Sequence, residues 1–177
     1  RSALRHVVTE TERRIGDLSA SLLDGSIDLA RWQRGMMEEI KLANLAATAA
    51  ARGGWAQLSP ADLGRAGSQV KAEYAYLRDY AKALASGDAP FDGRLRVRAG
   101  LYANTARRRY ESESYASGLG AGHTEARRRT NAVHSCEDCP GLSTGGRWVP
   151  IEDVVMPGEK CECGPACKCS VETRDAP

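Results

Sequence analysis

No cysteine occurs in residues 1–135 of this 177-residue chain, and all six lie in the last quarter. The sequence also lacks an apolar run near the ~20 residues that a bilayer-spanning helix needs, and it lacks a hydrophobic signal segment. With a formal net charge of only +2, the composition as a whole does not indicate a nucleic-acid-binding protein. These absences predict a soluble chain with no membrane partner. Because Arg1 falls inside a helical pattern, we expect a processed product or part of a longer protein.

The cysteine-rich end predicts a metal site. Two close groups of thiols joined by a loop are a typical way to present four soft ligands to zinc. Between Cys139 and Cys163 lie 23 residues, enough for a hairpin that folds the second group back onto the first, as in a zinc ribbon. The six are Cys136 and Cys139 in a C-x-x-C motif, then Cys161, Cys163, Cys167 and Cys169 within nine residues.

The choice among these ligands stays open. Cys161 is the most expendable by spacing, and His134 or Cys163 is a substitute ligand. The alternative chemistry is a set of disulfides, which an oxidising compartment favours and the missing signal segment disfavours. Spacing favours four thiolates for Zn²⁺: Cys136, Cys139, Cys167 and Cys169.

Residues 1–117 predict a helical body. Hydrophobic periodicity indicates helices over residues 2–23 and 28–51, and a proline after a capping serine indicates a third over 60–86. A seven-residue repeat in the third helix predicts a partner helix along its whole length. Asp92 caps a fourth helix that we expect to end near Tyr115, with its acidic residues, Glu111 and Glu113, in surface pairs. The repeat consists of Leu63, Val70, Leu77 and Leu84.

Residues 118–124 predict a glycine-rich hinge, and residues 125–177 a small β-rich module with strands near 125–133, 147–151 and 168–173. Large apolar residues are few in this module, so burial alone does not fold it. A bound metal supplies the missing stabilisation, because its binding free energy becomes folding free energy. The predicted fold class is therefore α+β, with a bundle of long amphipathic helices followed by a zinc-ribbon-like module.

Arginine runs at residues 107–109 and 127–129 suit either a solvated surface or a polyanion. Arg127, Arg128 and Arg129 are the candidate nucleic-acid contacts.

No catalytic constellation emerges from the sequence. His123 and Glu125 followed by the C-x-x-C motif imitate a zinc deaminase, but the gap is short and no proline precedes Cys136. His134 with Cys136 forms a poor nucleophilic pair, since no third group orients the histidine. We therefore expect no enzymatic activity.

The chain resembles a known family in several stretches. Residues 51–62 (ARGGWAQLSPAD), 74–78 (YAYLR) and 98–102 (RAGLY) are similar to the helical body of tailed-phage minor head proteins. Residues 134–139 (HSCEDC) and 163–169, with the spacing C-x-x-x-C-K-C, resemble the cysteine-rich end of the phage Mu F-like head morphogenesis family. Together these stretches cover most of residues 28–172.

The resemblance implies a structural minor capsid or head morphogenesis protein in the virion, present in the host cytoplasm during assembly. Its implied partners are capsid or portal proteins in a multi-copy assembly, with packaged DNA nearby. The chain departs from the family in Cys161 and in an enlarged loop over 140–160, so the ligand choice stays open. The metal-binding cysteines that the resemblance implies are Cys136, Cys139, Cys167 and Cys169, with Cys163 in the same pattern.

Two alternatives belong to other functional classes. One is a phage-delivered enzyme domain of the nuclease or toxin type, using His123, His134 and Asp138. The other is a nucleic-acid-binding zinc ribbon that uses the arginine run at residues 127–129.

Overall fold

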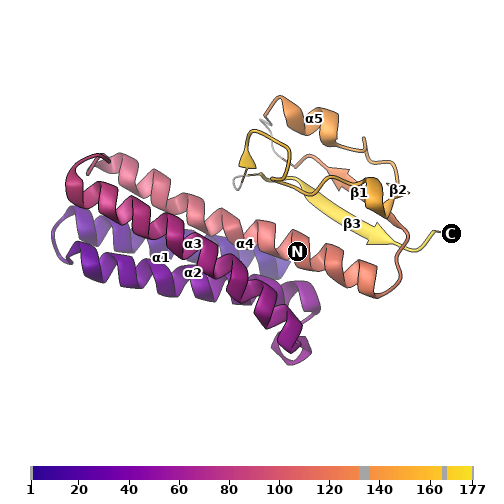
Figure 1. The fold of residues 1–177 in the computed structure, drawn as a ribbon, viewed down its shortest axis with the longest axis horizontal. Coiled ribbons are helices and arrows are strands. Elements are labelled where there is room, and N and C mark those ends of the chain that lie inside the picture. The colour runs from indigo at the N-terminus through magenta and orange to yellow at the C-terminus, as the bar shows by residue number, and fades with distance from the viewer. Residues whose placement is uncertain (1, 132–135, 165–166, 177) are drawn as a thin grey trace.

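The computed structural model describes residues 2–131, 136–164 and 167–176. Within them, four long helices form a bundle, and a small sheet lies beside the last turns of the fourth helix (Figure 1). The α+β fold class is therefore confirmed. The long helices are α1 (Ser2–Leu23), α2 (Leu29–Arg52), α3 (Pro60–Ser86) and α4 (Gly93–Gly120), and a short 3₁₀ turn, η1 (Trp55–Gln57), joins α2 to α3.

Helix boundaries follow the capping residues in the sequence. The Asp28 carboxylate accepts a hydrogen bond of 2.6 Å from the backbone N–H of Arg31 at the start of α2. Ser59 and Asp62 form a reciprocal capping box at the start of α3. At the end of α2, Gly53 adopts a φ of 87°, a left-handed conformation that glycine takes at little steric cost.

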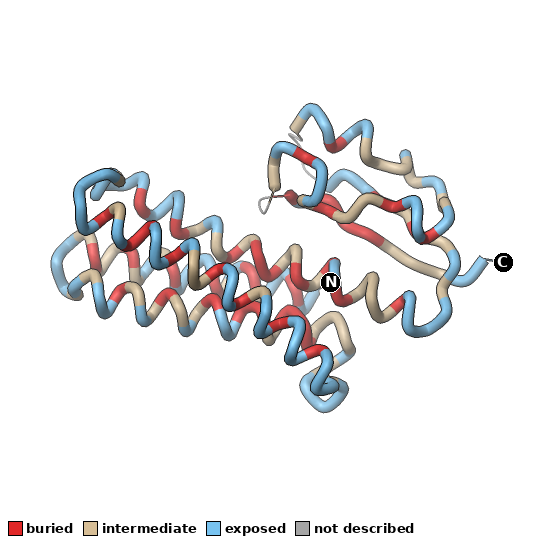
Figure 2. The backbone as a smooth tube through the Cα atoms, in the orientation of Figure 1, coloured by how far each residue is buried: buried red, intermediate tan, exposed pale blue. Residues whose placement is uncertain are grey.

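The bundle core centres on Trp32, whose side chain is completely buried. Its ring meets that of Tyr80 edge to face, with centroids 6.1 Å apart, and its indole N–H donates to the Ser19 hydroxyl at 3.4 Å. Figure 2 shows buried positions recurring along the helices where they face one another. None of the described helices is both long and apolar enough to cross a bilayer.

The seven-residue repeat of α3 is only partly covered. Val70, Leu77 and Leu84 are buried, whereas the Leu63 residue is 46% exposed. In Figure 1 the first turns of α3 project beyond the other helices, and there Leu63 is exposed although Asp62 and Ala66 beside it are buried. Partner helices therefore cover three of the four positions of the repeat, and Leu63, the first of them, lies outside this cover.

The acidic residues near the end of α4 are buried, which corrects the expectation of surface pairs. The Glu113 side chain is 1% exposed and accepts hydrogen bonds from Arg52 at 3.2 Å and from Arg65 at 2.9 Å, and it also pairs with Arg109. Burial raises the pKa of Glu113, but Arg65 and the other guanidinium groups outweigh burial and hold it below its usual value. Glu113 therefore joins α2, α3 and α4 through charge pairs inside the bundle.

The C-terminal sheet is antiparallel, with strand order β2-β1-β3. β1 lies in the centre, and its Ala126 faces Val149 on one side and Thr173 on the other. The described strands are shorter than predicted, and a short helix and a 3₁₀ turn were not predicted at all. The elements of this module are β1 (Glu125–Arg129), α5 (Asp138–Leu142), β2 (Val149–Pro150), η2 (Ile151–Asp153) and β3 (Ser170–Arg174).

The sheet packs directly on the end of α4. The backbone N–H of Val171 donates to the Glu111 carboxylate at 2.8 Å, and the Tyr115 hydroxyl donates to the carbonyl oxygen of Ile151 at 3.0 Å. A Cβ on Gly118 would lie 2.2 Å from the hydroxyl oxygen of Thr173, so only glycine allows this approach. Helix α4 therefore continues past its predicted end through the first residues of the predicted hinge.

Candidate metal centre

All six cysteines are free thiols and gather in one cluster. The closest pairs of sulfur atoms are 3.4 Å apart, whereas a disulfide bond measures about 2.05 Å. The prediction that the two cysteine groups fold onto one another is therefore confirmed, and the thiols are not joined in disulfide bonds. A C-x-x-C turn facing a second thiol group beside a small antiparallel sheet is a zinc-ribbon-like arrangement.

Four of the thiols form a complete first group. The sulfur atoms of Cys136, Cys139, Cys161 and Cys163 all lie within 4.8 Å of one another. Cys136 is 3.4 Å from both Cys139 and Cys163. A tetrahedral zinc ion with Zn–S bonds of about 2.3 Å separates its sulfur ligands by about 3.8 Å. The spacing of this group is therefore close to that of a tetrathiolate site.

A second group shares one member with the first. The sulfur atoms of Cys139, Cys167 and Cys169 also lie within 4.8 Å of one another. Cys139 is 3.5 Å from Cys169 and 3.8 Å from Cys167. With 1% of its surface exposed, Cys139 lies at the centre of the whole cluster.

The geometry differs from the ligand choice that spacing favours. Cys161, the most expendable by spacing, is buried and belongs to the first group. Cys136 does not share a group with Cys167 and Cys169. His134, the substitute ligand, lies outside the described residues. The C-x-C spacing of Cys161 and Cys163 was the signal in the sequence for a second chelating pair.

Backbone turns position the two cysteine segments. The N–H of Cys139 donates to the carbonyl of Cys136 at 3.3 Å, which closes the C-x-x-C turn. The N–H of Glu162 donates to the Asp138 carboxylate at 2.8 Å and ties the second segment to α5. At Gly158, with a φ of 85°, a Cβ would lie 2.5 Å from the carbonyl oxygen of Gly164. Only glycine therefore permits the tight loop that presents Cys161 and Cys163.

Arg128 is the residue of this site that sequence reasoning assigned elsewhere. Its side chain extends from β1 and is completely buried. One guanidinium nitrogen donates to the sulfur atoms of Cys139 at 3.6 Å and Cys167 at 3.9 Å, and the other donates to the Val155 carbonyl at 3.0 Å. No carboxylate is among its hydrogen-bond partners in the described part of the chain. The thiols are thus the groups near this buried cation that become anionic when they lose their protons.

The thiols differ in their affinity for protons. Burial raises the pKa of Cys139 and Cys163. A hydrogen bond from the backbone N–H of Cys163 lowers the pKa of Cys136. Burial raises the pKa of Cys167, but the N–H of Cys169 and other bonds outweigh this and lower it overall. Because metals bind thiolates, an ion entering this cluster displaces protons, and its affinity rises with pH.

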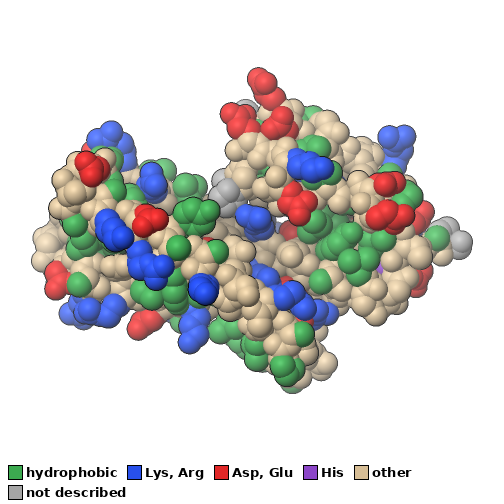
Figure 3. Space-filling model, in the orientation of Figure 1, with side chains coloured by type: hydrophobic (Ala, Val, Ile, Leu, Met, Phe, Trp, Pro, Cys, Tyr) green, Lys and Arg blue, Asp and Glu red, His purple; other side chains and the backbone are tan. Residues whose placement is uncertain are grey.

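The other two members of the arginine run lie on the outer side of the sheet. Arg127 pairs with Glu172 at 2.6 Å, and its guanidinium carbon lies 4.5 Å from the centre of the Trp148 ring. The Arg129 side chain is 50% exposed. Alternation along a strand explains why Arg128 points the opposite way. Nucleic-acid contact by this run stays a prediction, and Figure 3 shows Asp and Glu side chains gathered over the visible face around α5.

The residues of the enzyme alternative make structural contacts. His123 forms a hydrogen bond of 2.8 Å with the Thr173 hydroxyl, and Asp138 accepts from the backbone of Glu162. His134, the third residue of that hypothesis, lies outside the described residues. Among those described, the groups with metal-binding geometry contain only cysteines.

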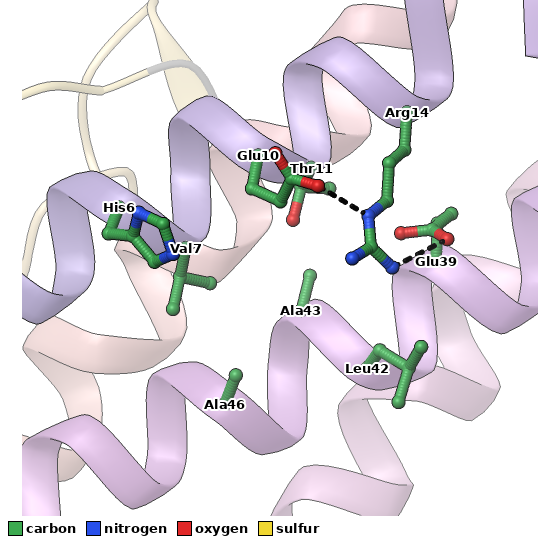
Figure 4. Close-up of a pocket in the computed structure, with 9 residues that line it drawn as sticks. All are labelled: His6, Val7, Glu10, Thr11, Arg14, Glu39, Leu42, Ala43 and Ala46. Carbon is green, nitrogen blue, oxygen red and sulfur yellow. Dashed lines mark hydrogen bonds and ion pairs between the residues drawn. The ribbon is translucent and has the colours of Figure 1, made fainter. Parts of the chain in front are cut away.

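A hollow of ≈ 160 Å³ between α1 and α2 is a separate feature. Figure 4 shows Arg14 reaching across it from α1, 2.8 Å from Glu10 and 3.6 Å from Glu39 of α2. The surrounding side chains are mainly small or aliphatic, and Glu10 and Arg14 already neutralise one another. The hollow is therefore part of the contact between the two helices, which ion pairs bridge.

No protein-family model matches the chain, and neither the curated proteins nor the solved structures contain a match. The cluster of thiols and the sequence motifs are therefore the features of this chain that indicate its function.

Proposed function

We propose that this chain is a structural protein of a tailed-phage head, a minor capsid or head morphogenesis protein whose C-terminal module is held in shape by zinc. The cluster of six thiols is the observation that carries the metal-binding half of this proposal. The similarity of residues 134–139 and 163–169 to the cysteine-rich end of phage head morphogenesis proteins supports the other half.

Zinc fits the donor set. Soft thiolates select zinc, copper(I) and iron–sulfur chemistry, whereas Mg²⁺ and Ca²⁺ take oxygen ligands. Four thiolates in tetrahedral positions form a closed site, which is the pattern of structural zinc; catalytic zinc sites keep one position for water or substrate. The four thiols of the first group supply such a closed shell, so we assign the ion a structural role and no catalysis.

The need for a metal follows from the small apolar core of the module. Among its described residues, the buried apolar cluster consists of Ala126, Ile151, Val154 and Val171. Domains with so little buried surface usually depend on a metal, disulfides or a partner. All six cysteines are free, so the metal crosslink stabilises the module in the way that structural zinc stabilises small domains.

Exposed apolar side chains support a role in an assembly. Trp55 and Leu63, 60% and 46% exposed, lie at and just beyond the turn from α2 to α3. Such side chains suit contact with capsid or portal subunits, where aromatic residues contribute much of the binding energy.

Elemental analysis tests the metal-binding half. Protein purified without added metal should contain zinc, and Cys139→Ser should lose most of it because Cys139 belongs to both thiol groups. Lys168→Ala, an exposed change between two cysteines, is the matched control and should retain zinc. Protein that contains no metal and binds none when zinc is supplied would contradict this half.

Quantitative mass spectrometry of purified phage heads tests the assembly half. We expect the chain in a fixed copy number per head, and a double change of Trp55 and Leu63 to alanine should reduce that number. Because both side chains are exposed, the doubly substituted chain should still fold. Heads that assemble normally and contain none of the unaltered chain would refute the structural role.

A further inference from the structure

The cluster holds more thiols than one ion uses. A single tetrahedral zinc takes four thiolates, and the first group already supplies them. Cys167 and Cys169 are nevertheless 3% exposed each and converge on Cys139 from the opposite side. These two buried thiols are therefore available as ligands for a second ion.

We propose that the cluster binds two divalent ions of the zinc class, with Cys139 and Cys163 bridging them. The first ion also takes Cys136 and Cys161, and the second also takes Cys167 and Cys169. This inference rests on the proposed metal binding and specifies its stoichiometry and ligands.

The position of Cys139 supports its role as a bridge. Its sulfur lies 3.4 Å from Cys136 in the first group, and 3.5 Å and 3.8 Å from Cys169 and Cys167 in the second. It is the one thiol shared by the two groups of described residues with metal-binding geometry. A sulfur in that position donates one lone pair to each ion.

Cys163 is the candidate for the second bridge. Its sulfur lies 3.4 Å from both Cys136 and Cys161, and 3.5 Å from Cys139. Because Cys139 also belongs to the second group, this contact brings Cys163 beside that group, although its sulfur is not within 4.8 Å of every member. Cys163 is therefore the first-group thiol, besides Cys139, that the second ion would take as its fourth ligand.

Ligand counting agrees with two bridges. Two tetrahedral ions offer eight coordination positions, and the chain brings six thiols to the site. Six thiolates fill all eight positions only when two of them bind both ions. The same arrangement leaves no thiol of the cluster without an ion.

The positive charge of Arg128 independently supports a negatively charged cluster. A completely buried guanidinium is costly unless an anion accompanies it. Its nitrogen points at Cys139 and at Cys167, on the side of the second group. Neutral thiols there would leave the cation uncompensated. Six thiolates with two divalent ions carry two net negative charges, which Arg128 partly neutralises.

Native mass spectrometry of the zinc-loaded full chain measures the stoichiometry. We expect two zinc ions in the unaltered protein and in the Lys168→Ala control. Cys161→Ser and Cys169→Ser should each retain one ion, because each removes a terminal ligand from a different site. Cys139→Ser should fall below one ion, because it weakens both sites together.

X-ray absorption of the unaltered protein adds a measurement that needs no variant. Two zinc ions that share a sulfur lie less than about 4.6 Å apart, twice the Zn–S bond of about 2.3 Å, so we expect a zinc–zinc shell inside that distance. One ion in the unaltered protein, or two ions without that shell, would overturn the bridged pair while leaving the metal-binding proposal intact. Protein without any ion would overturn both.

Discussion

The helical body and the C-terminal module are stabilised in different ways. The main core of the body contains eleven buried apolar residues around Trp32, whereas the apolar cluster of the module contains four. The stabilisation from hydrophobic burial scales with the apolar area removed from water. This stabilisation is therefore much larger in the body than in the module. The module has six converging thiols instead. With a metal bound as proposed, the chain would combine a region that folds by apolar burial with one that folds by metal coordination.

The two regions also treat buried charge differently. In the body, Arg109 and the Glu113 carboxylate pair inside the bundle. In the module, Arg128 is paired with sulfur. A carboxylate is anionic at neutral pH without help, whereas a buried thiol becomes anionic chiefly when a metal displaces its proton. With a metal bound as proposed, the charge balance of the module would depend on that metal, whereas that of the body does not.

Metal removal should separate the two regions most strongly. Structural zinc contributes about 10–16 kcal/mol in small zinc domains, so a strong chelator should unfold the module while the body stays folded. Hydrogen exchange followed by mass spectrometry should show lost protection in β1 and β3 and little change in α2. Equal loss of protection in α2 would show that the two regions fold as one unit.

The reverse experiment removes the centre of the helical core. Trp32→Ala should destabilise the body by about 3–5 kcal/mol because it leaves a large cavity. Trp55→Ala is the matched control, since Trp55 is 60% exposed, and it should change stability by no more than about 0.5 kcal/mol. Chemical denaturation followed by helical circular dichroism measures both. Similar losses for the two variants would refute the placement of Trp32 at the centre.

Substitution of Arg128 tests the charge balance of the module. Arg128→Leu should lower zinc affinity about 10–100-fold, the usual effect of losing a group that supports metal ligands. Arg129→Leu, at a 50% exposed side chain of the same strand, should leave affinity nearly unchanged. Competition with a chromophoric chelator gives both values. Equal affinities would show that the guanidinium does not stabilise the thiolates.

The contact between α4 and β3 can be tested with two neighbouring glycines. Gly118→Ala places a Cβ 2.2 Å from the Thr173 oxygen, and overpacking of this kind costs about 1–3 kcal/mol. Gly120→Ala meets nothing within 4 Å, and alanine suits a helix better than glycine. The melting temperature, measured by thermal unfolding, should therefore fall only for Gly118→Ala. A loss in both variants would point to the helix end itself instead of the contact.

Acid should weaken the body through Asp62. Hydrogen bonds from the backbone and hydroxyl of Ser59, with help from Arg52, lower the pKa of Asp62 from 3.8 to about 2. Because the folded-state pKa is the lower one, this carboxylate stabilises the fold fully above pH 3.8, and the contribution disappears as pH falls toward 2. Asp62→Asn should lower the melting temperature near neutral pH, with a difference that vanishes near pH 2.

The matched control for the acid experiment is Asp79→Asn, at a side chain that is 77% exposed. Its melting temperature should follow that of the unaltered protein across the whole range. Helical circular dichroism is the appropriate probe, because acid also protonates the thiols and releases the metal from the module. A difference for Asp62→Asn that persists unchanged at pH 2 would contradict the role of its charge.

Much of the fold could be predicted because its signals are local. Caps such as Asp28 and Ser59 mark where helices begin, and Gly53 marks where one ends. The end of α4 could not be predicted in this way. Gly118 resembles a helix breaker in the sequence, but here its missing side chain lets α4 approach Thr173. The decisive contact joins residues far apart in the chain.

The candidate site shows the same division. Crowded thiols were enough to predict a metal cluster, because chelation needs several ligands close together. Spacing alone ranked Cys161 as the most expendable thiol, although it lies in the first group. It also gave no sign of the role of Arg128, whose partners Cys139 and Cys167 lie 11 and 39 residues away in sequence. Burial of Glu113 among three arginines was likewise invisible, since those arginines come from three helices.

Helix α4 has a mechanical consequence for any assembly that includes this chain. Its 28 residues span about 42 Å at 1.5 Å per residue. One end packs in the bundle and the other end packs against the sheet. A force applied to the module is thus transmitted along the axis of α4 to the bundle, because no flexible linker separates the two. Two binding partners, one on the bundle and one on the module, would be held at a fixed separation and angle by this helix.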